Sequence, residues 1–311
     1  MDISVVIPVY GCKAALYELH FRLCKTLEDL VDSFEIVLVD DCCPQNSWEV
    51  IKEICKKDPR VIGIHLSRNF GQIRAITAGL DHCHGKWVVV MDCDLQDRPE
   101  FINTLFNKAQ EGYDVVFARR IERKDSIVTK SLSKLFYKVY NYFTDGAFDN
   151  AICNYSISKR IVIDNYCKMR EQGRAYTLFI KWLGFKQATI DAEGDKRFEG
   201  ESSYNLKRKM IMAFEIITAQ SNKPLKISAS FGIIIALFSF LYMISLIFKY
   251  IRGTEVPVGW TTIVASIYLM GGLLMFAIGV LGCYVGNIFD EVKNRPLYVI
   301  SEIINYGGGR L

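Results

Sequence analysis

The chain has 311 residues, half of them hydrophobic, and a formal net charge of +4 at pH 7. A charge this small does not argue for a nucleic-acid partner, and it suits a protein that rests on an anionic membrane surface. The ten cysteines are scattered and include no Cys-x-x-Cys pair, so we expect reduced thiols and a catalytic part in the cytosol. No basic, apolar leader precedes the first strand-like run, so no signal peptide is expected.

Short apolar runs alternate with amphipathic stretches of helical length as far as about residue 118. Strands are expected at 3–7, 35–39, 61–66, 88–91 and 115–118. Helices are expected near 14–29, 47–57, 72–82 and 99–111. Regular alternation of strand and helix predicts an α/β fold with a mostly parallel sheet between two layers of helices.

The most informative stretch is Val88–Glu100, because Asp92 and Asp94 follow an apolar strand-like run. They are expected at the carboxyl end of that strand, where open α/β sheets bind ligands. Two carboxylates so close repel each other unless a cation lies between them, and hard oxygen ligands suit Mg²⁺ or Mn²⁺ shared with phosphates. Asp97, followed by Pro99 and Glu100, is instead typical of a helix N-cap in a capping box.

Two other loops are expected on the same edge of the sheet. Asp40 and Asp41 follow the second strand, and the third is followed by 67–71, Ser-Arg-Asn-Phe-Gly. No Gly-x-Gly-x-x-Gly follows the first strand and no Walker sequence is present. Carboxylates in place of glycines indicate a metal-bridged diphosphate, as in a nucleotide-sugar.

The last third of the chain has the pattern of a membrane anchor. Residues 227–248 and 256–289 carry no charge, and each run exceeds the ~20 residues that cross a bilayer. Basic residues precede the first span and follow the second, which places both ends in the cytoplasm. The expected organisation is a catalytic domain at 1–224, a transmembrane hairpin at 225–289 and a cytoplasmic juxtamembrane segment at 290–311.

Two further stretches, 126–143 and 174–185, have apolar residues at helical spacing with lysines or arginines beside them. Each is either an interfacial amphipathic helix or an ordinary helix of the domain. Glycines of the second span, among them Gly279, Gly282 and Gly286, indicate close helix packing or a contact between protomers, so a homo-oligomer is possible.

Six segments, in this order and spacing, carry a resemblance that covers nearly the whole chain. They are 4–10 (SVVIPVY), 39–41 (VDD), 67–71 (SRNFG), 91–97 (MDCDLQD), 197–202 (RFEGES) and 290–298 (DEVKNRPLY). The chain resembles glycosyltransferase family 2 enzymes of the GT-A fold. Within them it is similar to the membrane-anchored polyisoprenyl-phosphate glycosyltransferases related to dolichol-phosphate mannose synthase and bacterial GtrB.

The resemblance implies roles on the donor side. The nucleotide would be held by Pro8, Tyr10, Asp40 and Asp41, the metal and diphosphate by Asp92 and Asp94, the sugar or a phosphate by Gln96, and the closing diphosphate contact by Arg197 and Ser202. On the acceptor side, Arg120 and Arg123 would bind the acceptor phosphate. The alternatives are that Pro8 only ends a strand and that both arginines are solvated surface charges.

Three positions depart from the family pattern. Gly11-Cys12-Lys13 replaces Asn-Glu-Glu, Gln72 replaces a lysine, and Asn154 stands where the family has an aspartate near the acceptor. Asn154 cannot act as a base. A phosphate monoester has a second pKa near ~6 and needs little deprotonation at neutral pH, so Asn154 favours a lipid-phosphate acceptor over a sugar hydroxyl.

We therefore expect inverting transfer of one sugar from a nucleotide-diphosphate-sugar to a polyisoprenyl (undecaprenyl or dolichyl) phosphate, at the cytoplasmic face of a bacterial plasma membrane. Mg²⁺ or Mn²⁺ would neutralise the leaving diphosphate. One alternative is a membrane-tethered transferase that extends a glycan hydroxyl. The other, motivated by Asn154, is a degenerate transferase that binds nucleotide-sugar or a protein partner without catalysis.

Overall fold

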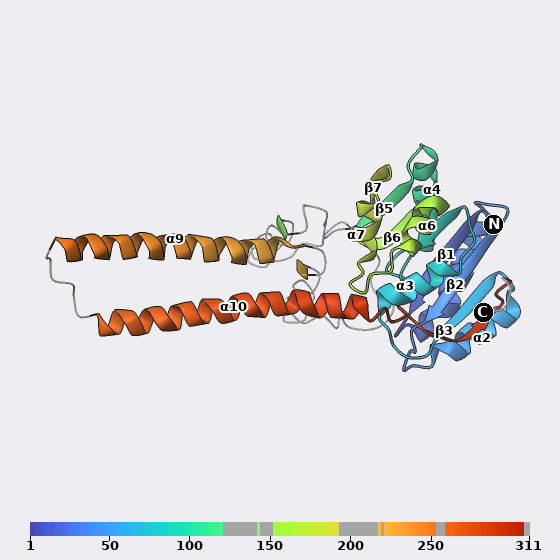
Figure 1. The fold of residues 1–311 in the computed structure, drawn as a ribbon. Helices are drawn as coiled ribbons and strands as arrows, with labels where there is room; N and C mark the ends of the chain where they lie inside the picture. Colours follow the sequence, from blue (N-terminus) through green and yellow to red (C-terminus); the bar gives the residue numbers. More distant parts are fainter. Residues whose placement is uncertain (121–141, 144–151, 193–216, 219–220, 253–258, 308–311) are drawn as a thin grey trace, which may run out of the picture. The chain divides into compact units, whose positions relative to one another are not determined.

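The protein is described here from a computed structural model. The structure describes residues 1–120, 142–143, 152–192, 217–218, 221–252 and 259–307. These residues belong to two compact units (Figure 1). The first comprises 1–141, 146–205 and 295–311, and the second comprises 142–145 and 206–294.

The first unit is built on one eight-stranded sheet of order β7-β5-β6-β4-β1-β2-β3-β8. Its strands are β1 (Ile3–Val9), β2 (Phe34–Asp40), β3 (Val61–Leu66), β4 (Trp87–Val90), β5 (Val115–Arg120), β6 (Ile152–Lys159), β7 (Gln187–Ala192) and β8 (Ile300–Ile304). Neighbours pair in parallel except at β6 and β8, which are antiparallel to the strands beside them. The mostly parallel α/β fold expected from the sequence is confirmed.

Helices cover both faces of this sheet (Figure 1). The helical elements are η1 (Lys13–Ala15), α1 (Leu16–Glu28), α2 (Ser47–Lys57), α3 (Gln72–Asp81), η2 (Pro99–Phe101), α4 (Ile102–Gln110), α6 (Arg160–Lys168) and α7 (Tyr176–Trp182). One core cluster joins α1, α2 and α4 to the sheet, and a second joins α3, α6 and α7 to it. Strand residues alternate between the clusters, Val5 in the first and Val6 in the second, as the two-residue period of a strand requires.

Pro8 is buried inside β1, which has a neighbour on each side. Pairing of β1 with β4 ends at Val6, opposite Val90, whereas pairing with β2 continues to Val9. A proline has no N–H to donate to a ladder, so it is tolerated where one neighbouring strand has already diverged. The divergence opens the sheet beyond β4, next to the loop that carries Asp92.

The segment after the second uncharged run returns to the sheet. Gly63 to Leu66 of β3 pair with residues 300–304 of β8, and Asn305 Nδ2 donates to the backbone oxygens of Cys55 and Val61 at 2.7 and 3.0 Å. The sequence predicted no strand here. Residues 300–304 are therefore part of the sheet of the first unit and cover the edge of β3.

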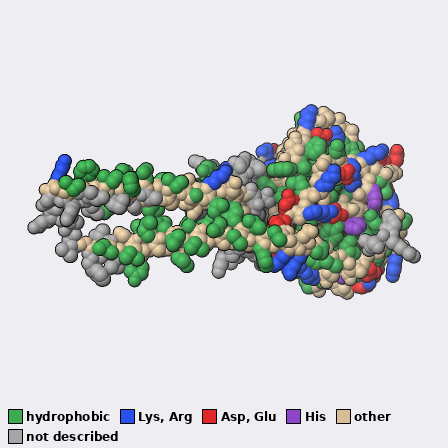
Figure 2. Space-filling model, viewed as in Figure 1, with side chains coloured by type: hydrophobic (Ala, Val, Ile, Leu, Met, Phe, Trp, Pro, Cys, Tyr) green, Lys and Arg blue, Asp and Glu red, His purple; other side chains and the backbone are tan. Residues whose placement is uncertain are grey.

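The second unit contains two long helices, α9 (Lys223–Ile251, 29 residues) and α10 (Trp260–Val292, 33 residues). Both are long and apolar enough to cross a membrane. Their large apolar side chains are exposed, for example Ile267 at 65% and Met275 at 70%. Figure 2 shows hydrophobic side chains along the length of both helices.

The two amphipathic stretches have different outcomes. Nearly all of 126–143 lies outside the described residues. In the other stretch, α7 buries Tyr176 and Phe179 in the sheet core and exposes Trp182, which is 77% accessible. This helix packs as an ordinary element of the domain along one face.

Candidate functional site

Asp41, at the end of β2, fixes the loop that follows β3. The buried carboxylate accepts hydrogen bonds from the backbone N–H groups of Phe70 (2.7 Å) and Gly71 (2.9 Å), and the Asp41 N–H donates to Val9 O. Burial raises the pKa of Asp41, and the two N–H donors oppose that rise. Gly71 has φ +95°, a conformation that favours glycine. Asp41 therefore acts mainly as a support for the loop.

Asp40 lies beside it and is oriented by a histidine. Its Oδ2 is 2.8 Å from His65 Nδ1, while Oδ1 is buried with no hydrogen-bond partner among the described residues. His65 stacks on Trp48 with ring centroids 5.0 Å apart, and Trp48 Nε1 donates to Glu302 of β8. Burial raises the pKa of Asp40, and the bond to His65 opposes it. Asp40 Oδ1 is thus a buried acceptor at the carboxyl end of β2.

Asp92 and Asp94 follow β4 as predicted, at the point where the sheet opens. Gln72 Nε2, at the start of α3, donates to Asp92 Oδ1 at 2.7 Å, and the Gln96 N–H donates to Asp94 Oδ1 at 3.1 Å. Leu95, which lies between Asp94 and Gln96, has φ +59°, and this conformation turns the backbone sharply. The short turn keeps both carboxylates on the same edge.

Arg120, the last residue of β5, connects the turn to the neighbouring strand. Its Nη1 donates to Gln96 Oε1 (3.3 Å) and its Nη2 to Asp97 Oδ1 (2.7 Å). The capping interpretation of Asp97 is wrong: η2 has Arg98 at its N-cap position with no side-chain cap, because the Asp97 carboxylate is bound to Arg120 instead. A pattern of local spacing could not reveal a partner that lies 23 residues away.

Acidic side chains gather around this turn. Asp92, Asp94 and Asp97 lie close together, and among the described residues Arg120 is a cation whose charge acts on Asp92. Burial, with the charges of Asp97 and Asp94, raises the pKa of Asp92 to about 7. Buried Asp97 Oδ2 has no hydrogen-bond partner in the described part of the chain. In the described part of the chain these carboxylates bring together the hard oxygen donors that a divalent cation such as Mg²⁺ or Mn²⁺ requires.

Asn154 belongs to the same edge by register. The β4–β6 pairing ends where Val90 meets Ser156 of antiparallel β6, so Asp92, two residues after Val90, and Asn154, two residues before Ser156, lie at the same end of this strand pair. Arg119 pairs with Ile152 at the same end of β6, which brings the end of β5 to this edge as well.

The remaining predicted residues divide into two groups. Tyr10 follows β1 and is 53% exposed, so its ring is accessible beside the carboxyl edge. Arg123, Arg197 and Ser202 lie outside the described residues, and their roles remain predictions.

The expectation that all cysteines are reduced is wrong at one pair. Cys12 and Cys93 form a disulfide with Cα atoms 6.2 Å apart, and the other cysteines are free. Because β1 and β4 are parallel neighbours, the loops that follow them meet although 81 positions separate the two residues. Without the argument from reduced thiols, the expectation of a cytosolic catalytic part depends on the basic residues that flank the long helices, and it stays a prediction.

Sequence reasoning missed His65 as the partner of Asp40 and Gln72 as the partner of Asp92. His65 is a polar residue near the end of an apolar strand, a signal that the strand pattern alone could have provided. In the sequence Gln72 is only a departure from the family pattern, because its contact with Asp92 depends on how α3 packs.

Comparison with known proteins agrees with this geometry. The sequence pattern of the family described as "Glycosyl transferase family 2" matches residues 4–166. An uncharacterized glycosyltransferase of Bacillus subtilis (strain 168) is 34% identical over 98% of this chain and 94% of its own length. An undecaprenyl-phosphate 4-deoxy-4-formamido-L-arabinose transferase of Shewanella sediminis is 32% identical (97% and 92%), and a prophage bactoprenol glucosyl transferase homolog of Escherichia coli (strain K12) is 30% identical (97% and 99%).

The glucosyl-3-phosphoglycerate synthase of Mycobacterium tuberculosis, solved with Mn²⁺, UDP and phosphoglyceric acid, shares the fold. The TM-score is 0.50 at 17% identity, over 70% of this chain and 76% of that one. The mostly parallel sheet and its strand order are those of the GT-A fold. The chain belongs to glycosyltransferase family 2.

Proposed function

We propose that this protein transfers a single sugar, with inversion, from a nucleotide-diphosphate-sugar to a polyisoprenyl phosphate at the cytoplasmic face of the membrane. The observation that carries the proposal is the combination, in one chain, of an acidic carboxyl edge built by Asp92 and Asp94 with two helices long enough to span a bilayer. Relatives similar over nearly the whole chain bear the names of bactoprenol and undecaprenyl-phosphate transferases.

Asp92 and Asp94 would hold a divalent cation, which when bound neutralises the charge of the diphosphate leaving group. Asp40, kept in orientation by His65, offers Oδ1 to a donor group of the base or ribose. The loop at Phe70 and Gly71, held by Asp41, leads directly into Gln72, which contacts Asp92, and so connects the two parts of the proposed donor site.

On the acceptor side, Arg120 supplies positive charge at the end of β5, and Asn154 supplies an amide at the same edge. A phosphate monoester is largely dianionic at neutral pH, so its oxygen attacks without a general base. Arg120 and Asn154 would orient that oxygen opposite the leaving diphosphate, and α9 and α10 would keep the pocket at the headgroups.

The test uses membranes that contain the full chain, incubated with undecaprenyl phosphate and labelled UDP-, GDP- and dTDP-sugars in turn, with Mn²⁺ or Mg²⁺. We expect label from one donor in the solvent-extractable lipid, and its loss with EDTA. Label in a saccharide fraction would point to a glycan acceptor. Binding of a nucleotide-sugar without transfer to any lipid would support a non-catalytic protein.

A further inference from the structure

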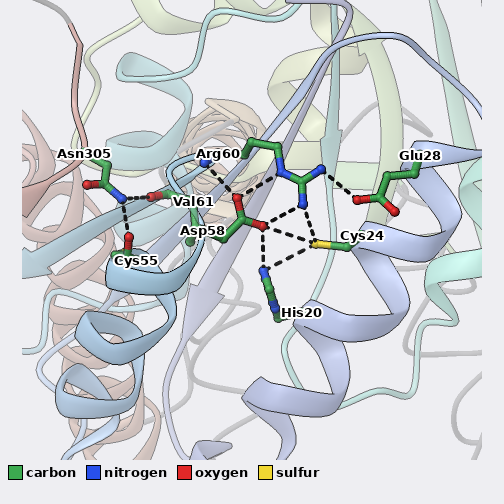
Figure 3. A network of polar contacts seen from close by, with 8 residues as sticks. All are labelled: His20, Cys24, Glu28, Cys55, Asp58, Arg60, Val61 and Asn305. Carbon is green, nitrogen blue, oxygen red and sulfur yellow. Dashed lines mark hydrogen bonds and ion pairs between the residues drawn. The ribbon is translucent and has the colours of Figure 1, made fainter.

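A second group of metal-ligand side chains lies at the opposite edge of the sheet. His20 and Cys24 are one turn apart on α1, and Asp58 directly follows α2 (Figure 3). Asp58 precedes β3, so it lies at the amino edge of the parallel strands, whereas Asp92 lies at the carboxyl edge. The three side chains point toward one another from two different segments of the fold.

Their donor atoms form a compact triangle. His20 Nε2 is 3.1 Å from Asp58 Oδ2, Cys24 Sγ is 3.3 Å from His20 Nε2, and Cys24 Sγ is 3.6 Å from Asp58 Oδ2. Zinc bond lengths of about 2.0–2.1 Å to nitrogen or oxygen and about 2.3 Å to sulfur give tetrahedral edges of roughly 3.3–3.6 Å. The triangle therefore has the dimensions of one face of a zinc tetrahedron, with the fourth position left to water.

The carboxylate of Asp58 is already held in a ligand's orientation. Its Oδ1 accepts hydrogen bonds from the backbone N–H of Arg60 (3.0 Å) and from Arg60 Nε (2.9 Å). Outer contacts of this kind fix a ligating carboxylate and leave its second oxygen for the metal. Oδ2 is the oxygen that faces His20 and Cys24.

Arg60 also occupies part of the place where a cation would bind. Its Nη2 is 2.9 Å from Asp58 Oδ2 and 3.7 Å from Cys24 Sγ. The side chain is 39% exposed, and Nη1 is paired with Glu28 at 2.8 Å. A small rotation toward Glu28 would withdraw Nη2 from the triangle while the backbone N–H of Arg60 keeps its bond to Oδ1.

We propose that His20, Cys24 and Asp58 bind one Zn²⁺, which joins α1 to the connection between α2 and β3. On binding, the Cys24 thiol loses its proton to solvent and a sulfur–zinc bond forms, so one proton is released without any redox change. The mixed nitrogen, sulfur and oxygen ligands select zinc or cobalt over the hard Mg²⁺ and Mn²⁺ that suit Asp92 and Asp94.

The experiment is a Co²⁺ titration of the full chain in detergent after removal of metals, because Co²⁺ reports a thiolate ligand by a near-ultraviolet charge-transfer band. We expect one Co²⁺ per chain with that band, its displacement by Zn²⁺, and a higher Tm in Zn²⁺. Cys24→Ser should abolish the band and weaken Zn²⁺ binding at least tenfold, and His20→Asn should weaken it similarly. Cys42→Ser, which removes an exposed free thiol, is the matched control.

A wild-type chain that shows no thiolate band at saturating Co²⁺, or a band that survives Cys24→Ser, would overturn the proposal. Circular dichroism checks that each variant is folded, and His20→Asn keeps the test decisive if Cys24→Ser does not fold. Sugar transfer in Mn²⁺ should be unchanged in Cys24→Ser, so the outcome here does not depend on the proposed function.

Discussion

The two units of this chain use apolar residues in opposite ways. In the first unit, called the sheet unit below, apolar residues form short strand runs that are buried, as at Val88 and Val89 in β4. In the second unit, called the helical unit below, apolar residues extend over two helices and remain exposed, as at Leu274 and Met275 in α10. The first pattern is typical of the core of a protein in water, and the second is typical of a surface that faces lipid.

The difference also separates where polar groups are found. In the sheet unit, buried carboxylates such as Asp41 and Asp97 are matched by N–H groups or a guanidinium from another segment. The uncharged stretches of α9 and α10 contain no acidic or basic side chain to satisfy. We therefore expect chemistry to depend on the sheet unit and membrane location on the helical unit. The two should be separable by mutation.

The largest expected effect is on chemistry alone. Asp94→Asn removes the charge of a proposed cation ligand while keeping the size of the side chain, so we expect transfer to lipid phosphate to fall at least about 100-fold. Retention of the protein in the membrane fraction should not change. Asp32→Asn, at an exposed acid outside the site, is the matched control. Full metal-dependent activity in Asp94→Asn would contradict the assignment.

The converse change acts on location alone. Met275→Arg places a charge near the middle of α10, on a side chain that is 70% exposed. A charged residue at the centre of a membrane helix costs about 2.5–3.5 kcal/mol on insertion scales. We expect less protein in carbonate-washed membranes, with nucleotide-sugar binding by the detergent-solubilised protein unchanged. Met275→Leu is the control; equal membrane retention of both variants would mean that α10 does not meet lipid.

Much of the fold was predictable because its signals are local. Strand and helix alternation in the first 118 residues predicted five strands and four helices within a few residues of their observed bounds. The edge that carries Asp92 and Asp94 followed from that alternation. The antiparallel strands β6 and β8 were not predicted, because their pairing depends on partners far away in the sequence.

The site was predicted less completely than the fold. The types of residue at Asp40, Asp92 and Asp94 indicated the chemistry, but not the side chains that orient them. Tertiary packing brings His65 to Asp40, Gln72 to Asp92 and Arg120 to Asp97. For the same reason, local spacing misassigned Asp97, and scattered positions concealed the Cys12–Cys93 disulfide.

An intermediate effect concerns the cation. The folded-state pKa of Asp92 is about 7, above the value of about 3.9 in an unfolded chain, so this group makes the protein less stable as pH rises from about 4 to 7. A divalent cation removes that penalty, and it binds the ionised form. We expect Mn²⁺ to raise the Tm more at pH 8 than at pH 6, measured by differential scanning fluorimetry in detergent.

Asp92→Asn tests whether the ionisation of Asp92 causes this pH dependence. In this variant Mn²⁺ should raise the Tm less than in the wild type, and the rise should be nearly the same at pH 6 and pH 8. Asp32→Asn should behave like the wild type. If Mn²⁺ raised the Tm of the wild type equally at pH 6 and pH 8, a proton on Asp92 would not be what competes with the cation.

The smallest effect is expected at the other edge of the sheet. Although burial opposes it, hydrogen bonds from Arg60 and His20 hold the pKa of Asp58 well below its ordinary value. Its contribution to stability is therefore complete above about pH 4 and is lost as pH falls from there toward the lowered folded-state pKa. Without added zinc, Asp58→Asn should lower the Tm by a few degrees at pH 6, and the difference from wild type should narrow toward pH 3. Asp164→Asn, at an exposed carboxylate, is the control. A constant difference across that range would mean that Asp58 acts through its shape and not through its charge.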